Sequence, residues 1–73
     1  MKIVDARGLQ SPEPFERVVE ALSELVLGDQ LKLIINQEPR HLYRFLERNR
    51  YAYKAEAYAD GRFEILIWEL AAA

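Results

Sequence analysis

Apolar residues recur along the chain in two kinds of pattern, which predict helices and strands in alternation. Between Pro12 and Gly28 the spacing of three and four places one set on a single helix face: Phe15, Val18, Val19, Leu22 and Leu25. Pro12 and Pro14 suit a first helical turn, and Gly28 is expected to end this helix in the left-handed conformation. A second helix is predicted from near Pro39 to Asn49, with an apolar face of Leu42, Phe45 and Leu46.

The remaining apolar stretches predict four strands. "KIVDA", residues 2–6, is a short first strand, and "LKLII", Leu31–Ile35, is apolar almost throughout, as in a strand buried on both faces. Residues 51–59 and 62–70 form the last two strands, and Asp60-Gly61 between them indicates a two-residue hairpin turn.

The predicted order is β-α-β-α-β-β, in one domain over residues 1–73. Two strand-helix-strand steps imply that the first two strands are parallel with right-handed crossovers, and the hairpin adds an antiparallel pair. Two helices can cover only one face of such a sheet. The fold class is therefore α/β: a two-layer sandwich of a four-stranded mixed sheet with two helices on one face.

Composition narrows the classes of function. The chain has no cysteine, which excludes disulfides, thiolate metal sites and thiol catalysis, and favours an intracellular, cytoplasmic protein. The N-terminal "MKIVDARG" has no long apolar segment, so neither a signal peptide nor a membrane span is expected. The net charge of -2 makes a nucleic-acid partner unexpected.

Two short segments resemble a known family. "DARGLQSPEP", residues 5–14, is similar to the opening of the TusA/SirA-like family, in which an Asp and then Gly-Leu precede Cys-Pro-x-Pro, and "NQEP", residues 36–39, resembles its acidic-residue-Pro step. The residues of these segments most resemble a cysteine-lacking branch of that family, domain-of-unknown-function family 2249. The resemblance implies a sulfur-carrying cysteine at the position of Ser11. A serine hydroxyl cannot hold a persulfide, so the scaffold is present without that chemistry.

Ser11 has two possible roles. As a helix cap it would accept a hydrogen bond from the backbone N–H of Glu13. As a nucleophile it would need a base, for which His41 is the sole histidine, but no Gly-x-Ser-x-Gly elbow accompanies it. The cap is the preferred reading, and no catalytic residue is assigned.

The loops after the two parallel strands are expected to meet at one edge of the sheet, where open α/β sheets bind ligands. The residues predicted at this weak ligand site are Arg7, Ser11, Arg40 and His41. Two helix starts and two arginines suit a small anion. The alternative is that Asp5 and Glu38 pair with the arginines and hold the loops. No metal site or cofactor is expected, since one histidine and scattered carboxylates have no ligand spacing.

The last two strands alternate in character. If Phe63, Ile65 and Ile67 face the helices, the uncovered face carries four further apolar residues: Ile34, Tyr58, Leu66 and Trp68. We expect these to contact a protein partner or a second copy. The alternative is scattered surface apolar residues, which are common.

These observations favour a small non-enzymatic adaptor or ligand-sensing module. One alternative is an enzyme or carrier subunit in redox or sulfur metabolism that uses the strand-end crevice. Another is an RNA-binding module that uses the basic stripe of the second helix, Arg40, Arg44 and Arg48.

Overall fold

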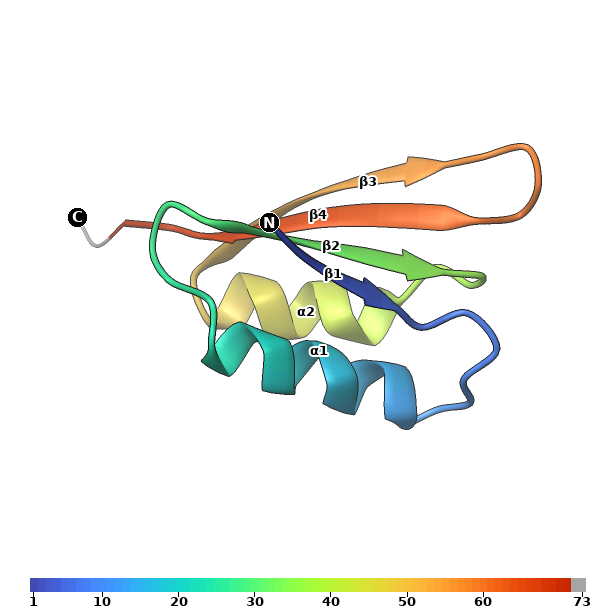
Figure 1. Cartoon of the computed structure of the whole chain (residues 1–73), viewed down its shortest axis with the longest axis horizontal. Coiled ribbons are helices and arrows are strands. Elements are labelled where there is room, and N and C mark those ends of the chain that lie inside the picture. Colours follow the sequence, from blue (N-terminus) through green and yellow to red (C-terminus); the bar gives the residue numbers. More distant parts are fainter. Residues whose placement is uncertain (72–73) are drawn as a thin grey trace.

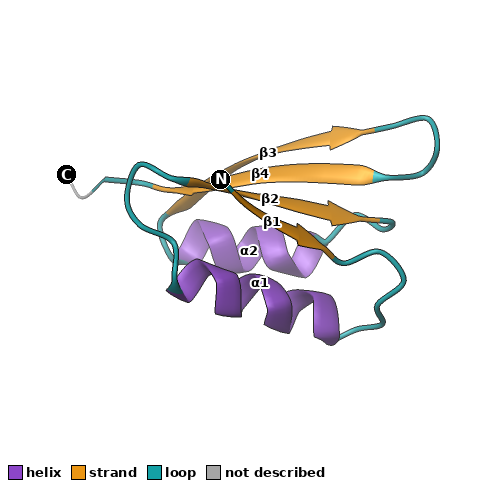
Figure 2. Ribbon diagram, in the orientation of Figure 1, coloured by secondary structure: helices purple, strands orange, loops and turns teal. Residues whose placement is uncertain are grey.

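The computed structural model describes residues 1–71, which form a four-stranded sheet with two helices on one face (Figure 1). The elements are β1 (Lys2–Asp5), α1 (Glu13–Ser23), β2 (Gln30–Ile35), α2 (Arg40–Arg48), β3 (Tyr51–Ala57) and β4 (Phe63–Glu69). The predicted element order and fold class are confirmed, and the two layers are visible in Figure 2. Within residues 1–71, neither helix has the length and hydrophobicity of a membrane span.

The strands lie in the order β1-β2-β4-β3. β1 and β2 are parallel, whereas β4 runs antiparallel to both of its neighbours, β2 and β3. The carboxyl ends of β1 and β2 therefore lie at the same edge, and both helices start from the loops that follow them (Figure 1). This arrangement brings the two helix starts together, as the sequence predicts.

The core lies between the sheet and the helices. Its fully buried large side chains come from both helices and from β2 and β4: Val18, Leu31, Leu33, Leu46, Ile65 and Ile67. Burial alternates along β2, because the helices cover only one face of the sheet. The expectation that β2 is buried on both faces is therefore wrong: Lys32 and Ile34 lie on the uncovered face and are partly exposed.

The start of α1 differs from the prediction. Pro12 occupies the cap position, and no side chain caps the helix. The N–H of Glu13, the expected partner of the Ser11 hydroxyl, donates to the backbone oxygen of Gln10 at 2.9 Å. Pro12 and Pro14 have no N–H to donate. Ser11 is thus an exposed residue and not the helix cap.

Two turns also differ from expectation. The hairpin closes with the N–H of Tyr58 donating to the oxygen of Arg62 at 2.8 Å, around the three residues Ala59, Asp60 and Gly61. Gly61 has a φ of 90°, as in a three-residue loop that ends in a left-handed residue, so the predicted two-residue turn is wrong. α1 ends at Ser23, and Gly28, with a φ of 94°, turns the chain into β2 instead of ending the helix.

Candidate functional site

A cleft of about 270 Å³ lies between the starts of α1 and α2, at the carboxyl-end edge of β1 and β2. Its lining comprises Ser11, Pro14, Phe15, Leu33, Ile35, Gln37, Glu38, Pro39, Arg40, His41 and Leu42. The sheet contributes the floor, and the two helix starts contribute the walls. The cleft therefore occupies the place at which open α/β sheets bind ligands.

The floor of the cleft is apolar. Leu33 and Ile35 of β2 lie on the helix-covered face, and Leu42 of α2 packs beside them. Phe15 meets the ring of Phe45 edge-to-face, with the centroids 5.3 Å apart, which fixes its orientation at the cleft wall. An apolar floor of this size suits the apolar body of a compact molecule.

The rim of the cleft is polar. Ser11, Arg40 and His41 are all exposed and line the same cleft, so three of the four predicted ligand-site residues come together. The Arg40 guanidinium approaches the Glu38 carboxylate at 3.4 Å, yet its side chain remains 84% exposed. Its remaining N–H groups are thus available to a ligand.

Tyr43 fixes the acidic side of the rim. Its hydroxyl donates to Glu38 at 3.4 Å, and its ring stacks on that of Tyr53, with centroids 4.5 Å apart. Burial, together with the Glu38 carboxylate, raises the pKa of Tyr43 to about 12, so the phenol keeps its proton. The Glu38 carboxylate therefore accepts a hydrogen bond from Tyr43 and forms an ion pair with Arg40. Sequence reasoning missed Tyr43, although its place beside Leu42 at the border of the apolar helix face is a usable signal.

Arg7, the fourth predicted residue, does not line the cleft. Its guanidinium bonds to the Asp5 carboxylate at 2.8 and 2.9 Å, and its backbone N–H donates to the same carboxylate at 3.2 Å. These bonds with Arg7 lower the pKa of Asp5 to about 2. Asp5 and Glu38 thus form the ion pairs of the alternative, and Arg7 lies outside the lining of the cleft. Ligand binding by these arginines stays a prediction.

Ser11 and His41 border one cleft, but no hydrogen bond joins them among the described residues. Within residues 1–71 there is also no cluster of three or more His, Asp or Glu side chains that could hold a metal ion. What the cleft offers is apolar contact, a hydroxyl, an imidazole and an exposed guanidinium. Groups of these kinds can bind and orient a small molecule.

The uncovered face of the sheet carries the other predicted set. The assignment of strand faces is confirmed, because Ile65 and Ile67 are fully buried and alternate with Leu66 and Trp68. In the pairing of β2 with β4, Leu66 lies opposite Lys32, and Trp68 opposite Gln30. Leu66, Trp68 and Ile34 are only partly exposed. Contact with a partner through this face stays a prediction.

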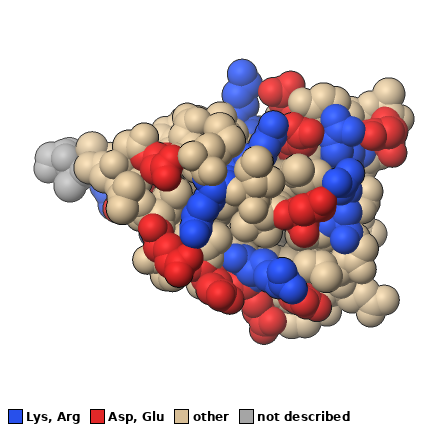
Figure 3. Space-filling model, viewed as in Figure 1, with Lys and Arg blue, Asp and Glu red and all other residues tan. Residues whose placement is uncertain are grey.

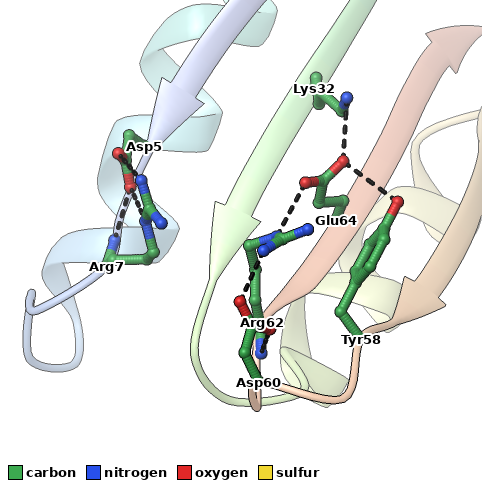
Figure 4. Close-up of polar contacts among 7 residues, drawn as sticks. All are labelled: Asp5, Arg7, Lys32, Tyr58, Asp60, Arg62 and Glu64. Carbon is green, nitrogen blue, oxygen red and sulfur yellow. Dashed lines mark hydrogen bonds and ion pairs between the residues drawn. The ribbon is translucent and has the colours of Figure 1, made fainter.

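Ion pairs cross one end of this uncovered face (Figure 4). The Glu64 carboxylate bonds to Lys32 at 2.9 Å and to Arg62 at 2.9 Å, and Arg62 in turn pairs with Asp60. The Lys32 ammonium and, secondarily, Arg62 hold the pKa of Glu64 below its ordinary value. The guanidinium of Arg62 also lies over the ring of Tyr58, 4.1 Å from the centroid.

Basic and acidic side chains are interspersed on the side of the molecule seen in Figure 3, with no large patch of one sign. A surface of this kind gives no continuous attraction for a phosphate backbone. The RNA-binding alternative through Arg40, Arg44 and Arg48 stays a prediction.

The parallel strand pair, the two helix starts and the cleft between them define a two-layer α/β sandwich with a strand-end cleft. The chain belongs to the family described as "Uncharacterized conserved protein (DUF2249)", whose model matches residues 3–69. The resemblance inferred from residues 5–14 and 36–39 is thereby confirmed.

A solved structure supports the same assignment. The SirA-like protein from Desulfitobacterium hafniense is 26% identical in sequence and superposes with a TM-score of 0.83. The match covers 92% of this chain and 95% of that one. No curated protein shows a significant match.

Proposed function

We propose that this chain is a non-enzymatic ligand-sensing module of the cytoplasm, whose ligand is a compact molecule with an apolar body and one anionic end. The observation that carries the proposal is the cleft of about 270 Å³ between the two helix starts, which combines an apolar floor with a polar rim. Its volume is slightly below the range of drug-sized sites, which favours a small ligand.

The two parts of the cleft support the two parts of the ligand. Pro14, Phe15 and Ile35 offer apolar contact in the cleft, which removes the ligand body from water. Arg40 offers an exposed guanidinium at the rim, with N–H groups beyond the one that faces Glu38. An anionic group can accept hydrogen bonds from these N–H groups.

The hydroxyl of Ser11 is not an activated nucleophile, which favours binding over catalysis. A serine hydroxyl stays protonated near neutral pH and needs a positioned base to react. The nearest imidazole, that of His41, forms no hydrogen bond with Ser11 among the described residues. If the protein is an adaptor, the same cleft would bind a ligand that changes the affinity of the module for its protein partner.

Benzoate is a suitable probe, because it has an apolar ring and one carboxylate. Amide signals in a ¹H–¹⁵N NMR spectrum should shift and saturate on titration with benzoate, first at Ser11, Phe15 and residues 37–42. Sulfate, which lacks an apolar body, should give smaller shifts at the same rim residues. Arg40→Ala should weaken benzoate binding by about threefold, the effect of one exposed charge.

The matched control is Arg44→Ala, which removes the same charge one turn further along α2, outside the cleft lining. It should leave benzoate binding unchanged. Shifts spread evenly over the charged surface, or equal weakening by the two variants, would contradict a ligand site in the cleft.

A further inference from the structure

The sheet has two edges, of which β1 offers four residues and β3 seven. β3 pairs with β4 alone, in a one-to-one register that runs from Tyr51 opposite Glu69 to Ala57 opposite Phe63. This register contains no bulge, and the strand contains no proline. A regular edge of seven residues is a template for pairing with another chain.

Hydrogen bonds at both ends of the hairpin show which backbone groups of β3 are unpaired. The N–H of Tyr58 donates to Arg62, and the N–H of Leu70 donates to the oxygen of Arg50, so the even-numbered residues direct their backbone toward β4. In an antiparallel ladder the direction alternates. The backbone groups that point away from the sheet therefore belong to Tyr51, Tyr53, Ala55 and Ala57.

The second half of β3 is also uncovered by helices. Residues 54–57 are exposed, whereas Tyr51 and Tyr53 are partly buried. Figure 1 shows the turn end of the hairpin projecting beyond both helices. The edge is thus accessible along the half that carries Lys54 and Glu56, and neither of these side chains forms an ion pair within residues 1–71.

We propose that two copies of this chain pair through β3, antiparallel and centred on Ala55, so that the two sheets join into one. This inference is independent of the ligand cleft. The outward backbone groups then meet in three hydrogen-bonded pairs, Ala55 with Ala55 and Tyr53 with Ala57 twice. Backbone bonding of this kind supplies affinity, and side chains on alternate residues supply the register.

The charges on β3 select the register. Centred on Ala55, each Lys54 lies directly opposite Glu56 of the other copy, on the uncovered face. A shift of the centre to Lys54 would place the two lysines opposite each other, and a shift to Glu56 would do the same with the two glutamates. An edge lysine ordinarily discourages association, but in this register its charge is matched.

The sizes of the side chains agree with the same register. Tyr53, stacked on Tyr43 and partly covered by α2, lies opposite Ala57 of the other copy, which is small and exposed. On the uncovered face, Tyr58 of one copy lies opposite Ala52 of the other. The helix-covered half of each β3 strand therefore meets the uncovered half of the other. A two-fold axis at Ala55 makes every contact reciprocal.

Sedimentation equilibrium up to about 1 mM protein tests the proposal. The wild type should approach twice the 8.5 kDa mass of one chain. Lys54→Glu alone, or Glu56→Lys alone, turns both attractive pairs into repulsive ones and should weaken the dimer by about tenfold. The double exchange Lys54→Glu with Glu56→Lys restores opposite charges across the axis and should restore the dimer.

Mixing the two single variants gives the sharpest readout, because each repels its own copy and attracts the other. A mixed dimer should form where neither variant dimerises alone. Circular dichroism and thermal unfolding of each variant establish that the fold is retained. A wild type that stays monomeric overturns the proposal. A dimer whose affinity does not change with these charge exchanges overturns it too, and loss of that dimer in Trp68→Glu would place the contact on the uncovered face.

Discussion

On the face of the sheet that the helices cover, alternate residues of β2 and β4 pack into a buried core, whereas on the other face their neighbours stay partly exposed and some form ion pairs. Leu33 and Ile65 lie opposite each other on the covered face and are fully buried. One residue further along β4, Leu66 is flanked by Lys32 and Lys54 and remains partly exposed. The same strands therefore hold the fold together with one face and leave the other to solvent or partners.

This difference follows from the period of two in a strand. Each strand presents alternate residues to opposite faces, so one covering layer of helices imposes apolar side chains on half of the positions only. The ion pairs around Glu64 occupy the other half at the hairpin end of the face. These pairs are partly buried, because the Glu64 and Arg62 side chains are only 16% and 26% exposed.

The largest expected effect comes from shortening matched leucines on the two faces. Leu33→Ala opens a cavity in the core and should lower the free energy of unfolding by about 2–5 kcal/mol. Leu66→Ala, in the neighbouring strand on the uncovered face, should lower it by about 1 kcal/mol or less. Urea unfolding followed by circular dichroism measures both, and equal losses would contradict the division between the faces.

A smaller effect is expected at the border of the covered face, where Tyr43 of α2 stacks on Tyr53 of β3. The coupling energy between the two rings should be about 0.5–1.5 kcal/mol. A double-mutant cycle with Tyr43→Ala and Tyr53→Ala isolates this coupling from the loss of buried area. Tyr53→Phe is the control, since it keeps the ring and removes only the hydroxyl that donates to Glu47 at 2.7 Å. If the two losses in the free energy of unfolding are additive, the coupling energy between the stacked rings is zero and the prediction is wrong.

The smallest effect is a pH dependence at the Asp5–Arg7 pair at the end of β1. The folded state holds the pKa of Asp5 at about 2, below its ordinary 3.8, so the contribution to stability is present above about pH 4 and is lost as the pH falls toward 2. Asp5→Asn has no such contribution. The difference in melting temperature between wild type and variant should therefore shrink over this interval. A difference that stays constant from pH 5 to pH 2 would contradict the pairing.

Periodicity predicts most of the fold, because the spacing of Phe15 to Leu25 and the alternation of Phe63 to Trp68 report directly on which face is buried. Local hydrogen bonding is harder to predict. The Ser11 cap failed because the backbone oxygen of Gln10 competes for the same N–H, and periodicity carries no signal of that competition. The hairpin turn failed by one residue for a similar reason, since Asp60-Gly61 suits both turn lengths.

The candidate site was predicted in part. Ser11, Arg40 and His41 share the cleft because topology alone brings the two helix starts together. Arg7 lies outside the cleft lining, where its guanidinium pairs with Asp5, two residues away. The apolar residues of the cleft floor were predicted only as core residues. The sequence pattern does not distinguish a core side chain from one that borders a cleft.

The short first strand has a consequence for how far the sheet can grow. β1 offers only four residues on its outer edge, and its flanking charges are engaged by Glu24 and Arg7. A chain with two regular edges can add copies without limit and form fibres. In the proposed dimer, pairing through β3 would occupy the longer edge of each copy and leave the four-residue edge of β1 at either end. So short an edge would favour a closed pair over the continued addition of copies.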